Sequence, residues 1–557
     1  MSVATTAASA ALNTHEVANQ ATPLEGLDTF AVNRPLREAL EREGGGFAVE
    51  AAHELGRLAG RPEVIALGFQ ANEHPPVLHT HDRVGRRIDE VEFHPAWHEL
   101  MRLGVSYGLH AAPWRDPRPG AHVARATLFS LLSSVEAGFG CPISMTYSIV
   151  PALRAQPELA ADWEPGLTSL DYDPGLRAPA GKRGLLAGMA MTEKQGGSDV
   201  RANTTVAEPV DGGGPGGEYA LTGHKWFCSA PMCDVFLVLA QAPGGLSCFL
   251  VARVLPDGSR NAFHLQRLKD KLGNRSNASS EIELHGALAR LVGEEGRGVP
   301  TIIEMVAHTR LDCCVGGATI MRQGVAHALH HTAERSAFGR RLIDQPLMIN
   351  VLADLCVESE AATVTAMRLA RAYDEAGESA EHGRFRRLAT AVAKYWLCKR
   401  APGHAHESLE CLGGNGYVEA SGLPRLYREA PLNGIWEGSG NVICLDVLRA
   451  MARDPGGVEA FWAEVDEAAG ADPRLDAFVS AARSELTDLD AIESRARRVV
   501  ERMALALQGS LLVRHAPAPV ADAFCASRLE GDHGGAYGTL PPGLALEEIV
   551  ERHRPAA

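Results

Sequence analysis

The spacing of apolar residues divides the chain into four segments. From about residue 33 to 165, apolar side chains recur mainly at helical intervals, and prolines mark loops at 72–83 and 112–120. Between about 184 and 290, alternating and β-branched stretches predict short strands, and the apolar run 235–251, broken at Pro243, predicts two strands and a turn. Helical periodicity returns from Thr301 to about residue 400, and a helical tail follows residue 450.

This order of segments predicts an α+β fold, because segregated helices and strands differ from the alternation that a parallel sheet requires. We expect four domains. These are an N-terminal helical domain with an irregular arm over 1–183, a small central β domain over 184–290, a helical bundle over 291–450, and an additional, mostly helical C-terminal domain over 451–557.

The composition is that of an ordinary globular protein. Of the 557 residues, 45% are hydrophobic and 22% are charged, which excludes a wholly disordered or fibrous chain. The 54 basic and 69 acidic side chains give a net charge of −15. That charge argues against unaided binding to a nucleic-acid backbone, although a local basic stripe can exist within an acidic chain.

Other sequence features favour a cytoplasmic protein without a membrane segment. The first twenty residues lack a basic segment and a long apolar core, so we expect no secretory signal. Eleven cysteines without a CxxC pair, including the neighbours Cys313 and Cys314, indicate buried thiols in a reducing compartment. His94 and His98 have no third ligand at a recognisable spacing, so we expect capping or surface histidines and no metal site.

Two segments of the β-rich region carry groups suited to a polar, planar ligand. In 188–205, Thr192 precedes a Gly-Gly-Ser-Asp turn whose hydroxyls and N–H groups suit a phosphate or a polar ring edge; the alternative is a solvated loop. In 221–234, Trp226 and Phe227 are expected on opposite faces of a strand. One would then pack in the core while the other presents a flat surface; alternatively, both are core aromatics.

A third segment, 431–451, holds a carboxylate suited to proton transfer. Glu437 ends an apolar run at a glycine turn, where loss of solvent would raise its pKa and make it a base near neutral pH. Ser439 and Asn441 are expected to cap the next helix, whose N-terminus favours an anion. The alternative is that Glu437 is an ordinary charge at the start of that helix.

Together and in this order, three motifs resemble the acyl-CoA dehydrogenase superfamily. "MTEKQGGSD" is similar to its flavin-contacting signature, "GHKWFCSA" to the segment that stacks on the flavin, and "IWEGSGN" to the stretch that holds the catalytic glutamate. The segments 68–98 and 436–449, with the hundred residues after 450, are similar to the AidB-type branch of the DNA-alkylation response. The resemblance implies an acyl-CoA dehydrogenase-like fold, FAD as cofactor, and α,β-dehydrogenation of an acyl-CoA thioester.

The resemblance also implies roles for individual residues. Glu437 is the base, because Thr309, at the base position of the isovaleryl branch, has no carboxylate. Phe227 takes the place of the stacking tryptophan, and Ser229 takes that of the hydroxyl bonded to flavin N5. The implied FAD contacts are Met191, Thr192, Ser198, Phe227, Cys228, Ser229, Arg335, Phe338, Gly413, Gly414, Ser439 and Asn441.

The family further implies a homotetramer with FAD near the subunit interfaces, so that Arg335 and Phe338 serve a neighbouring subunit, and electron-transfer flavoprotein as a candidate partner. This sequence departs from the family pattern near those contacts. Glu410 and Pro346 stand where the family has glutamines, and Lys194 and Gln195 stand in place of Pro and Gly.

The AidB resemblance raises a second hypothesis, a protein that binds duplex DNA and whose dehydrogenase activity is vestigial. The candidate DNA contacts form one basic stripe at helical spacing: Arg495, Arg497, Arg498 and Arg502. Residues 451–557 nevertheless hold 11 arginines and no lysine against 18 acidic residues, a net charge of −7. The alternative is therefore a solvated face whose arginines pair with nearby carboxylates. A third hypothesis is a tetrameric scaffold that binds FAD structurally.

Overall fold

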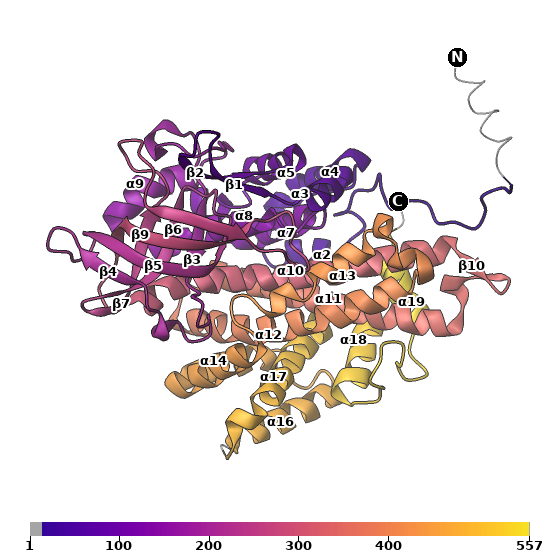
Figure 1. The fold of residues 1–557 in the computed structure, drawn as a ribbon. Helices are drawn as coiled ribbons and strands as arrows, with labels where there is room; N and C mark the ends of the chain where they lie inside the picture. The colour runs from indigo at the N-terminus through magenta and orange to yellow at the C-terminus, as the bar shows by residue number, and fades with distance from the viewer. Residues whose placement is uncertain (1–13, 489, 556–557) are drawn as a thin grey trace.

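Helices and a seven-stranded sheet occupy different parts of the computed structural model, which describes residues 14–488 and 490–555 (Figure 1). The sheet lies at one end, and three long helices run from it towards the other end. This separation is the expected α+β arrangement. The first 13 residues of the expected N-terminal arm, and residues 556–557 of the tail, lie outside the described residues.

The N-terminal region is mostly helical, as expected, but it also contains a β-hairpin. Its helices are α2 (Arg34–Arg42), α3 (Val49–Ala59), α4 (Pro62–Glu73), α5 (Pro95–Ser106), α6 (Ala112–Arg115), α7 (Ala121–Ser133), α8 (Gly140–Leu153) and α9 (Pro157–Leu167). Strands β1 (Val77–His81) and β2 (Arg87–Glu92) pair antiparallel, so the prediction of a loop throughout 72–83 is wrong. Pro75 and Pro76 end the helix, and the alternating residues that follow then form a strand. His94 caps α5 by accepting a hydrogen bond from the Ala96 N–H, which confirms its predicted capping role.

The central region forms the larger sheet. Its strands are β3 (Ala187–Ala190), β4 (Val206–Pro209), β5 (Glu218–Ser229), β6 (Val235–Ala242), β7 (Gly245–Ala252), β8 (Phe263–Leu268) and β9 (Ser279–Val292). The turn predicted within 235–251 is confirmed, with Ala242 paired to Gly245. Pairings β6–β7, β7–β9, β9–β5, β5–β4 and β4–β6 close a circle around a buried apolar interior.

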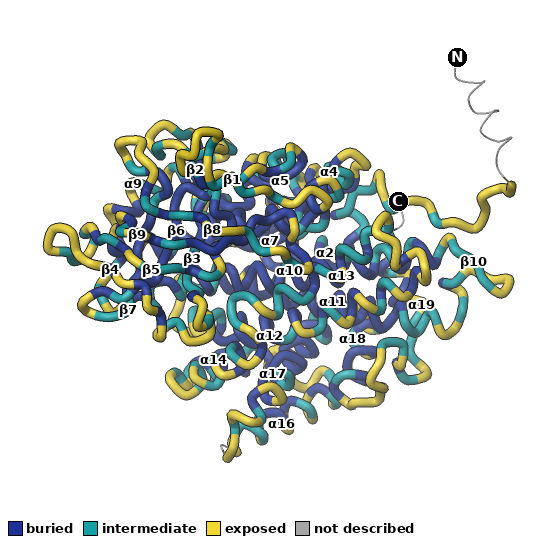
Figure 2. The backbone as a smooth tube through the Cα atoms, in the orientation of Figure 1, coloured by how far each residue is buried: buried dark blue, intermediate teal, exposed yellow. Residues whose placement is uncertain are grey.

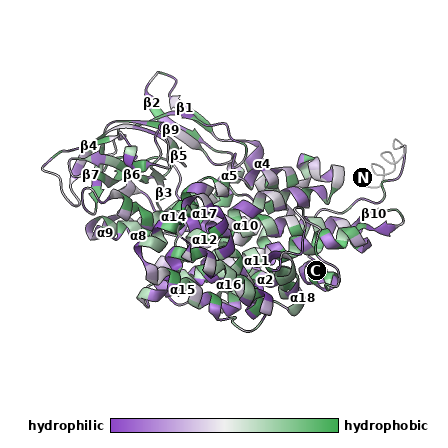
Figure 3. Cartoon of the chain, turned by 90° about the horizontal axis from the view of Figure 1, so that it is seen from below, coloured by the Kyte–Doolittle hydropathy of each residue, from purple (hydrophilic) through white to green (hydrophobic). Residues whose placement is uncertain are grey.

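The bundle consists of α10 (Gly298–Glu334), α11 (Pro346–Glu375) and α12 (Ala380–Glu410), with the small hairpin β10 (Ser336–Ala337) and β11 (Arg340–Arg341) after α10. Buried residues follow these helices through the centre of the molecule (Figure 2). Polar and apolar residues alternate along them (Figure 3), and none of the described helices combines the length and apolar character needed to span a bilayer.

The remaining helices pack on this bundle. They are α13 (Leu423–Glu429), α14 (Gly440–Arg453), α15 (Pro455–Asp466), α16 (Pro473–Thr487), α17 (Ile492–His515), α18 (Ala518–Phe524) and α19 (Leu546–His553). Helix α17 contacts α11, α12 and α14, and α19 contacts α11. The helical character expected beyond residue 450 is therefore present, and this part shares its hydrophobic core with the bundle.

Candidate active site

Glu437 lies in a turn whose backbone conformation is unusual. Its φ is +59°, in the left-handed region that residues other than glycine seldom adopt, and Gly438 follows at +103°. Two cationic side chains of the bundle hold the turn. Lys394 of α12 donates to the carbonyls of Trp436 (2.7 Å) and Gly438 (2.5 Å), and Arg310 of α10 donates to the carbonyl of Glu437 (3.0 Å). Three successive carbonyls are thus satisfied by side chains that the sequence does not place near Glu437.

The carboxylate of Glu437 is desolvated. Its Oε2 atom is buried and has no hydrogen-bond partner among the described residues. Burial raises the pKa of this carboxyl group, while the Thr309 hydroxyl and the charges of Arg310 and Lys394 oppose the rise. Thr309 is the second base position that the resemblance names, so both positions meet at one place. Glu437 is therefore the carboxylate available there for proton transfer.

Cys141, near the start of α8, connects Glu437 to the sheet. Burial raises the pKa of this thiol to about 12; Lys271 opposes the rise, Glu437 adds to it, and Ser229 and Asn277 also oppose it. All of these groups consequently face the same thiol. The residue predicted to act as base and the residue predicted to meet flavin N5 therefore both lie near Cys141, which the sequence did not single out.

A β-bulge presents an aromatic ring beside this position. Lys225 of β5 pairs with Ile282 and Cys228 pairs with Ser280, so β5 has one extra residue between these pairs. The bulge interrupts the alternation of faces. Phe227 is consequently 49% exposed and Trp226 is half-buried, with the two rings edge to face. The expectation that one ring enters the core is therefore wrong.

The other predicted residues of this segment differ in exposure. Cys228 is fully buried, and its carbonyl accepts a hydrogen bond from Ser280 Oγ (2.9 Å), so the structure does not expose it to a ligand. Met191 and Thr192 are half-buried and Ser198 is exposed, and the Trp226 N–H donates to the Thr192 carbonyl (2.8 Å). This bond brings the first two motifs side by side.

Glu193, inside the first motif, stabilises the loop and does not face a ligand. It is fully buried and accepts a hydrogen bond from Lys225 Nζ (2.8 Å) and from the N–H and hydroxyl groups of Thr204 and Thr205. Burial favours the neutral acid, but Lys225 and these bonds outweigh it and hold the pKa of Glu193 at about 2. A buried ion pair thus fixes the shape of the loop.

The residues around Cys141 suit a polar, planar group such as the flavin of FAD. The half-exposed Phe227 ring offers a stacking surface. The Ser229 hydroxyl lies on the same strand, β5, and the Thr192 hydroxyl lies on the loop that is hydrogen-bonded to this strand. Several buried polar atoms nearby have no partner among the described residues: Ser276 Oγ and both side-chain polar atoms of Asn277. Buried polar atoms are normally satisfied, so these atoms leave hydrogen-bonding capacity beside Cys141.

A second group of predicted FAD contacts lies at the other end of the chain. Phe338 sits in the β10–β11 hairpin with a φ of +52° and is 98% exposed, and the hairpin projects from the end opposite the sheet (Figure 1). Arg335 precedes this hairpin, and Gly413 and Gly414 lie just beyond α12. Within one chain, the structure does not bring these four residues to Phe227 and Glu437.

Ser439 and Asn441 do not cap α14 as expected. Ser439 is the N-cap residue, but its side chain makes no capping hydrogen bond. The Asn441 side-chain oxygen instead accepts a hydrogen bond from Arg497 Nε of α17 (2.8 Å). Both residues are exposed, so they stay available to a ligand.

Three arginines of the predicted basic stripe share one carboxylate. Glu485 of α16 lies 2.8 Å from Arg498, 3.2 Å from Arg502 and 3.8 Å from Arg495. Arg495 also pairs with Asp488 at 3.1 Å. The alternative of a face paired with carboxylates therefore describes three of the four arginines.

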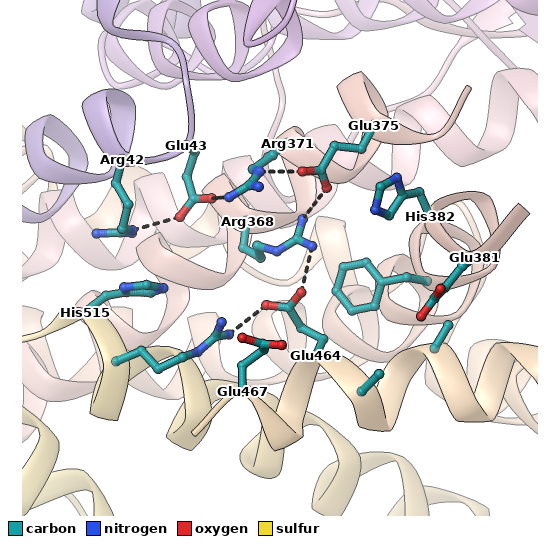
Figure 4. Close-up of a pocket in the computed structure, with 14 residues that line it drawn as sticks. Arg42, Glu43, Arg368, Arg371, Glu375, Glu381, His382, Glu464, Glu467 and His515 are labelled. Atoms are coloured by element: carbon teal, nitrogen blue, oxygen red, sulfur yellow. Dashed lines mark hydrogen bonds and ion pairs between the residues drawn. The ribbon is translucent and has the colours of Figure 1, made fainter. Parts of the chain in front are cut away.

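Two further clusters lie away from Glu437. A cavity of about 390 Å³ opens where α2, α11, α12, α15 and α17 meet, and alternating arginines and glutamates line it (Figure 4). The possible ligand atoms of His406, Glu407 and Glu410 lie within 4.8 Å of one another at the end of α12. Exposed acidic groups of this kind are common without a metal. The cluster ends just before Gly413 and Gly414, in the second group of predicted contacts.

Comparison with known families matches most of the chain. Residues 19–174 match the adaptive response protein AidB N-terminal domain, 188–287 the middle domain of acyl-CoA dehydrogenases, and 296–452 their C-terminal domain. These boundaries follow the change from helices to sheet and back.

Individual relatives agree with this match. The putative acyl-CoA dehydrogenase AidB of Escherichia coli is 44% identical over 93% of this chain and 95% of its own. Acyl-CoA dehydrogenase family member 11 of Caenorhabditis elegans is 32% identical over 82% of this chain and 78% of its own. The crystal structure of Caenorhabditis elegans ACDH-11 in complex with C11-CoA superposes with a TM-score of 0.83, at 28% identity, over 93% of this chain and 95% of that one.

Proposed function

Because the chain belongs to the acyl-CoA dehydrogenase family, in its AidB branch, we propose that it is a FAD-dependent enzyme that oxidises the α,β bond of an acyl-CoA thioester. One observation carries the proposal. Glu437, whose Oε2 is buried and has no partner among the described residues, and Ser229 both influence the pKa of the Cys141 thiol, so a candidate base and a candidate flavin contact lie near the same group. The C11-CoA bound to the Caenorhabditis elegans relative supports an acyl thioester as substrate.

The residues that would hold FAD come from the two neighbouring motifs. Phe227 would stack on the flavin, Thr192 and the Met191 backbone would meet its ring edge, and the Ser229 hydroxyl would donate to N5. When bound, FAD supplies the acceptor for the hydride that leaves the β carbon. Arg335, Phe338, Gly413 and Gly414 would complete the dinucleotide site of a neighbouring subunit in a homotetramer, and electron-transfer flavoprotein is the proposed acceptor of the electrons.

Glu437 would remove the α-proton. Its raised pKa makes the carboxylate a stronger base than a solvated glutamate, and burial keeps water from competing for it. Lys394 and Arg310 bind the backbone of the turn rather than the carboxylate. They therefore hold the base in position without forming a hydrogen bond to its Oε2.

The test is anaerobic reduction of the FAD-loaded protein by acyl-CoAs of graded chain length. The loss of flavin absorbance measures the rate of reduction. We expect Glu437→Gln to slow reduction by about 10²- to 10⁴-fold, the usual contribution of a general base. The variant should keep its FAD, because Glu437 Oε2 bonds no other described group. Equal reduction rates in wild type and Glu437→Gln would remove Glu437 from the mechanism, and no reduction by any thioester would remove the proposed activity.

A further inference from the structure

A half-buried lysine is linked by hydrogen bonds to the residue proposed to meet flavin N5. Lys271 is in the loop between β8 and β9, and its Nζ donates to Ser279 Oγ (3.0 Å) and to the Asn277 carbonyl. Ser279 Oγ lies 3.4 Å from Ser229 Oγ, and these two serines are direct partners in the β5–β9 pairing. The three side chains therefore form a chain that runs from an ammonium group to Ser229.

The chemistry of the first group fixes the direction of the first hydrogen bond and allows the second to run the same way. An ammonium group donates and cannot accept, whereas a hydroxyl donates one hydrogen and accepts at its oxygen. Ser279 Oγ accepts from Lys271, so its own hydrogen is free to point at Ser229 Oγ. With that direction the Ser229 hydrogen is not used within the chain, and Ser229 is half-buried, so a bound ligand can reach it.

We propose that Lys271 is a positioning residue which, through Ser279, keeps the Ser229 hydroxyl oriented as a donor to N5 of the bound flavin. The inference rests on the proposed function, since it requires FAD beside Phe227 and Ser229. It adds a residue that none of the three motifs contains. It also gives a role to a half-buried charge.

The surroundings keep this lysine charged. Lys271 faces the Cys141 thiol of α8, Glu136 just before that helix and Glu429 of α13. Burial lowers the pKa of Lys271 to about 8, so the ammonium form still predominates at pH 7. Burial and the nearby Glu136 raise the pKa of Glu429 to about 7.

The experiment measures the midpoint potential of FAD in the intact protein, together with the rate of its reduction by an acyl-CoA. Lys271→Met removes the donor, and Ser279→Ala breaks the chain without changing any charge. Both should lower the potential and slow reduction about tenfold or more, as expected for loss of a hydrogen bond to a charged group. Arg275→Gln is the control, because Arg275 is an exposed residue of the same loop.

A double-variant comparison separates positioning from a simple charge effect. In a Ser229→Ala background, Lys271→Met should change the potential much less than it does in the wild type. An unchanged potential in Ser279→Ala, or an equal effect of Lys271→Met in both backgrounds, would overturn the inference. If Lys271→Met does not fold, Ser279→Ala decides alone.

The inference and the proposed function fail in different ways. The potential is measured by chemical reduction, so it does not depend on any acyl-CoA being a substrate. A protein that binds FAD but is reduced by no thioester would contradict the proposed function only. A protein that binds no FAD would contradict both.

Discussion

At Glu437, the backbone is held by hydrogen bonds, whereas one oxygen of the side chain is left without a partner in the described part of the chain. The backbone of the turn is bonded by Lys394 and Arg310, while Oε2 of the carboxylate has no partner among the described residues. Hydrogen bonds to three carbonyls hold the turn in its strained, positive-φ conformation, and the desolvated Oε2 makes the carboxylate a stronger base. Both properties depend on helices α10 and α12, which are distant in sequence from residue 437.

The raised pKa of Glu437 predicts the acidic limb of the pH profile. Proton abstraction requires the carboxylate, so kcat/KM should fall as the pH drops through the pKa of Glu437. Because that pKa lies above the ordinary value for glutamate, the fall should begin at a higher pH than for a solvated glutamate. Stopped-flow reduction over pH 5 to 9 measures it. A limb at the ordinary glutamate pKa would contradict the desolvation of this carboxylate.

The raised pKa of Glu437 also predicts a change in the free energy of unfolding, which has the opposite pH dependence to the activity. A carboxyl whose pKa is raised by folding contributes stability below its unfolded pKa, and this contribution is lost as the pH rises through the folded pKa. Glu437→Gln should therefore be more stable than wild type at pH 8, with little difference at pH 4. Urea unfolding at both pH values tests this, and a destabilised variant at pH 8 would contradict it.

At the scale of elements, ion pairs fasten α15 and α17 to the bundle. Glu464 of α15 pairs with Arg368 of α11 (2.7 Å) and Arg514 of α17 (2.6 Å), and Arg371 of α11 continues the series to Glu43, beside α2 (Figure 4). The Glu464 side chain is only 12% exposed. One carboxylate thus joins three helices of which two lie beyond residue 450.

We expect Glu464→Gln to lower the free energy of unfolding by about 1–3 kcal/mol at pH 7, because it leaves two partly buried arginines without their carboxylate. Burial raises the pKa of Glu464, but Arg368 and Arg514 lower it overall, so the stabilisation is lost as the pH falls through that lowered pKa. The difference from wild type in urea unfolding should shrink there. Glu467→Gln, in the same cavity but exposed, is the control and should change little.

The arginines of α17 carry the alternative function, and its test belongs to this scale. If they bind duplex DNA, log Kd should rise linearly with log salt concentration, and Arg497→Gln with Arg498→Gln should reduce that slope by about 2. Fluorescence anisotropy with a labelled duplex measures the slope, and Arg453→Gln is an exposed control. A slope that the double variant leaves unchanged would exclude this stripe as the DNA site. The pairing with Glu485 favours weak binding.

For the whole molecule, the separation of the two groups of FAD contacts matters most. Phe227 and Glu437 lie near the sheet, whereas Phe338 projects from the opposite end (Figure 1). An exposed phenylalanine in a strained hairpin is costly in water, and an interface would explain it. This arrangement supports sites shared between subunits.

Shared sites predict complementation. Glu437→Gln and the double variant Arg335→Gln/Phe338→Ala should each be inactive alone. When the two variants are co-expressed with different tags, the mixed assembly should recover part of the activity. Some sites then combine the intact Glu437 of one subunit with the intact Arg335 and Phe338 of its neighbour. Sequential affinity purification and the acyl-CoA assay measure this. No recovery in purified mixed assemblies would contradict sites shared between subunits.

The sequence by itself determined the order of domains and the positions of the chemistry. Periods of helix and strand, and the motifs at Thr192, Phe227 and Glu437, depend only on residues close along the chain, so the α+β fold and the family could be predicted. Tertiary structure decided the rest. Only packing brings Thr309, Lys394 and Arg310 to Glu437, turns Phe227 outward at a bulge, and places Glu485 among the arginines. These contacts join residues far apart in sequence, and burial, which sets pKa values, exists only once the chain has folded.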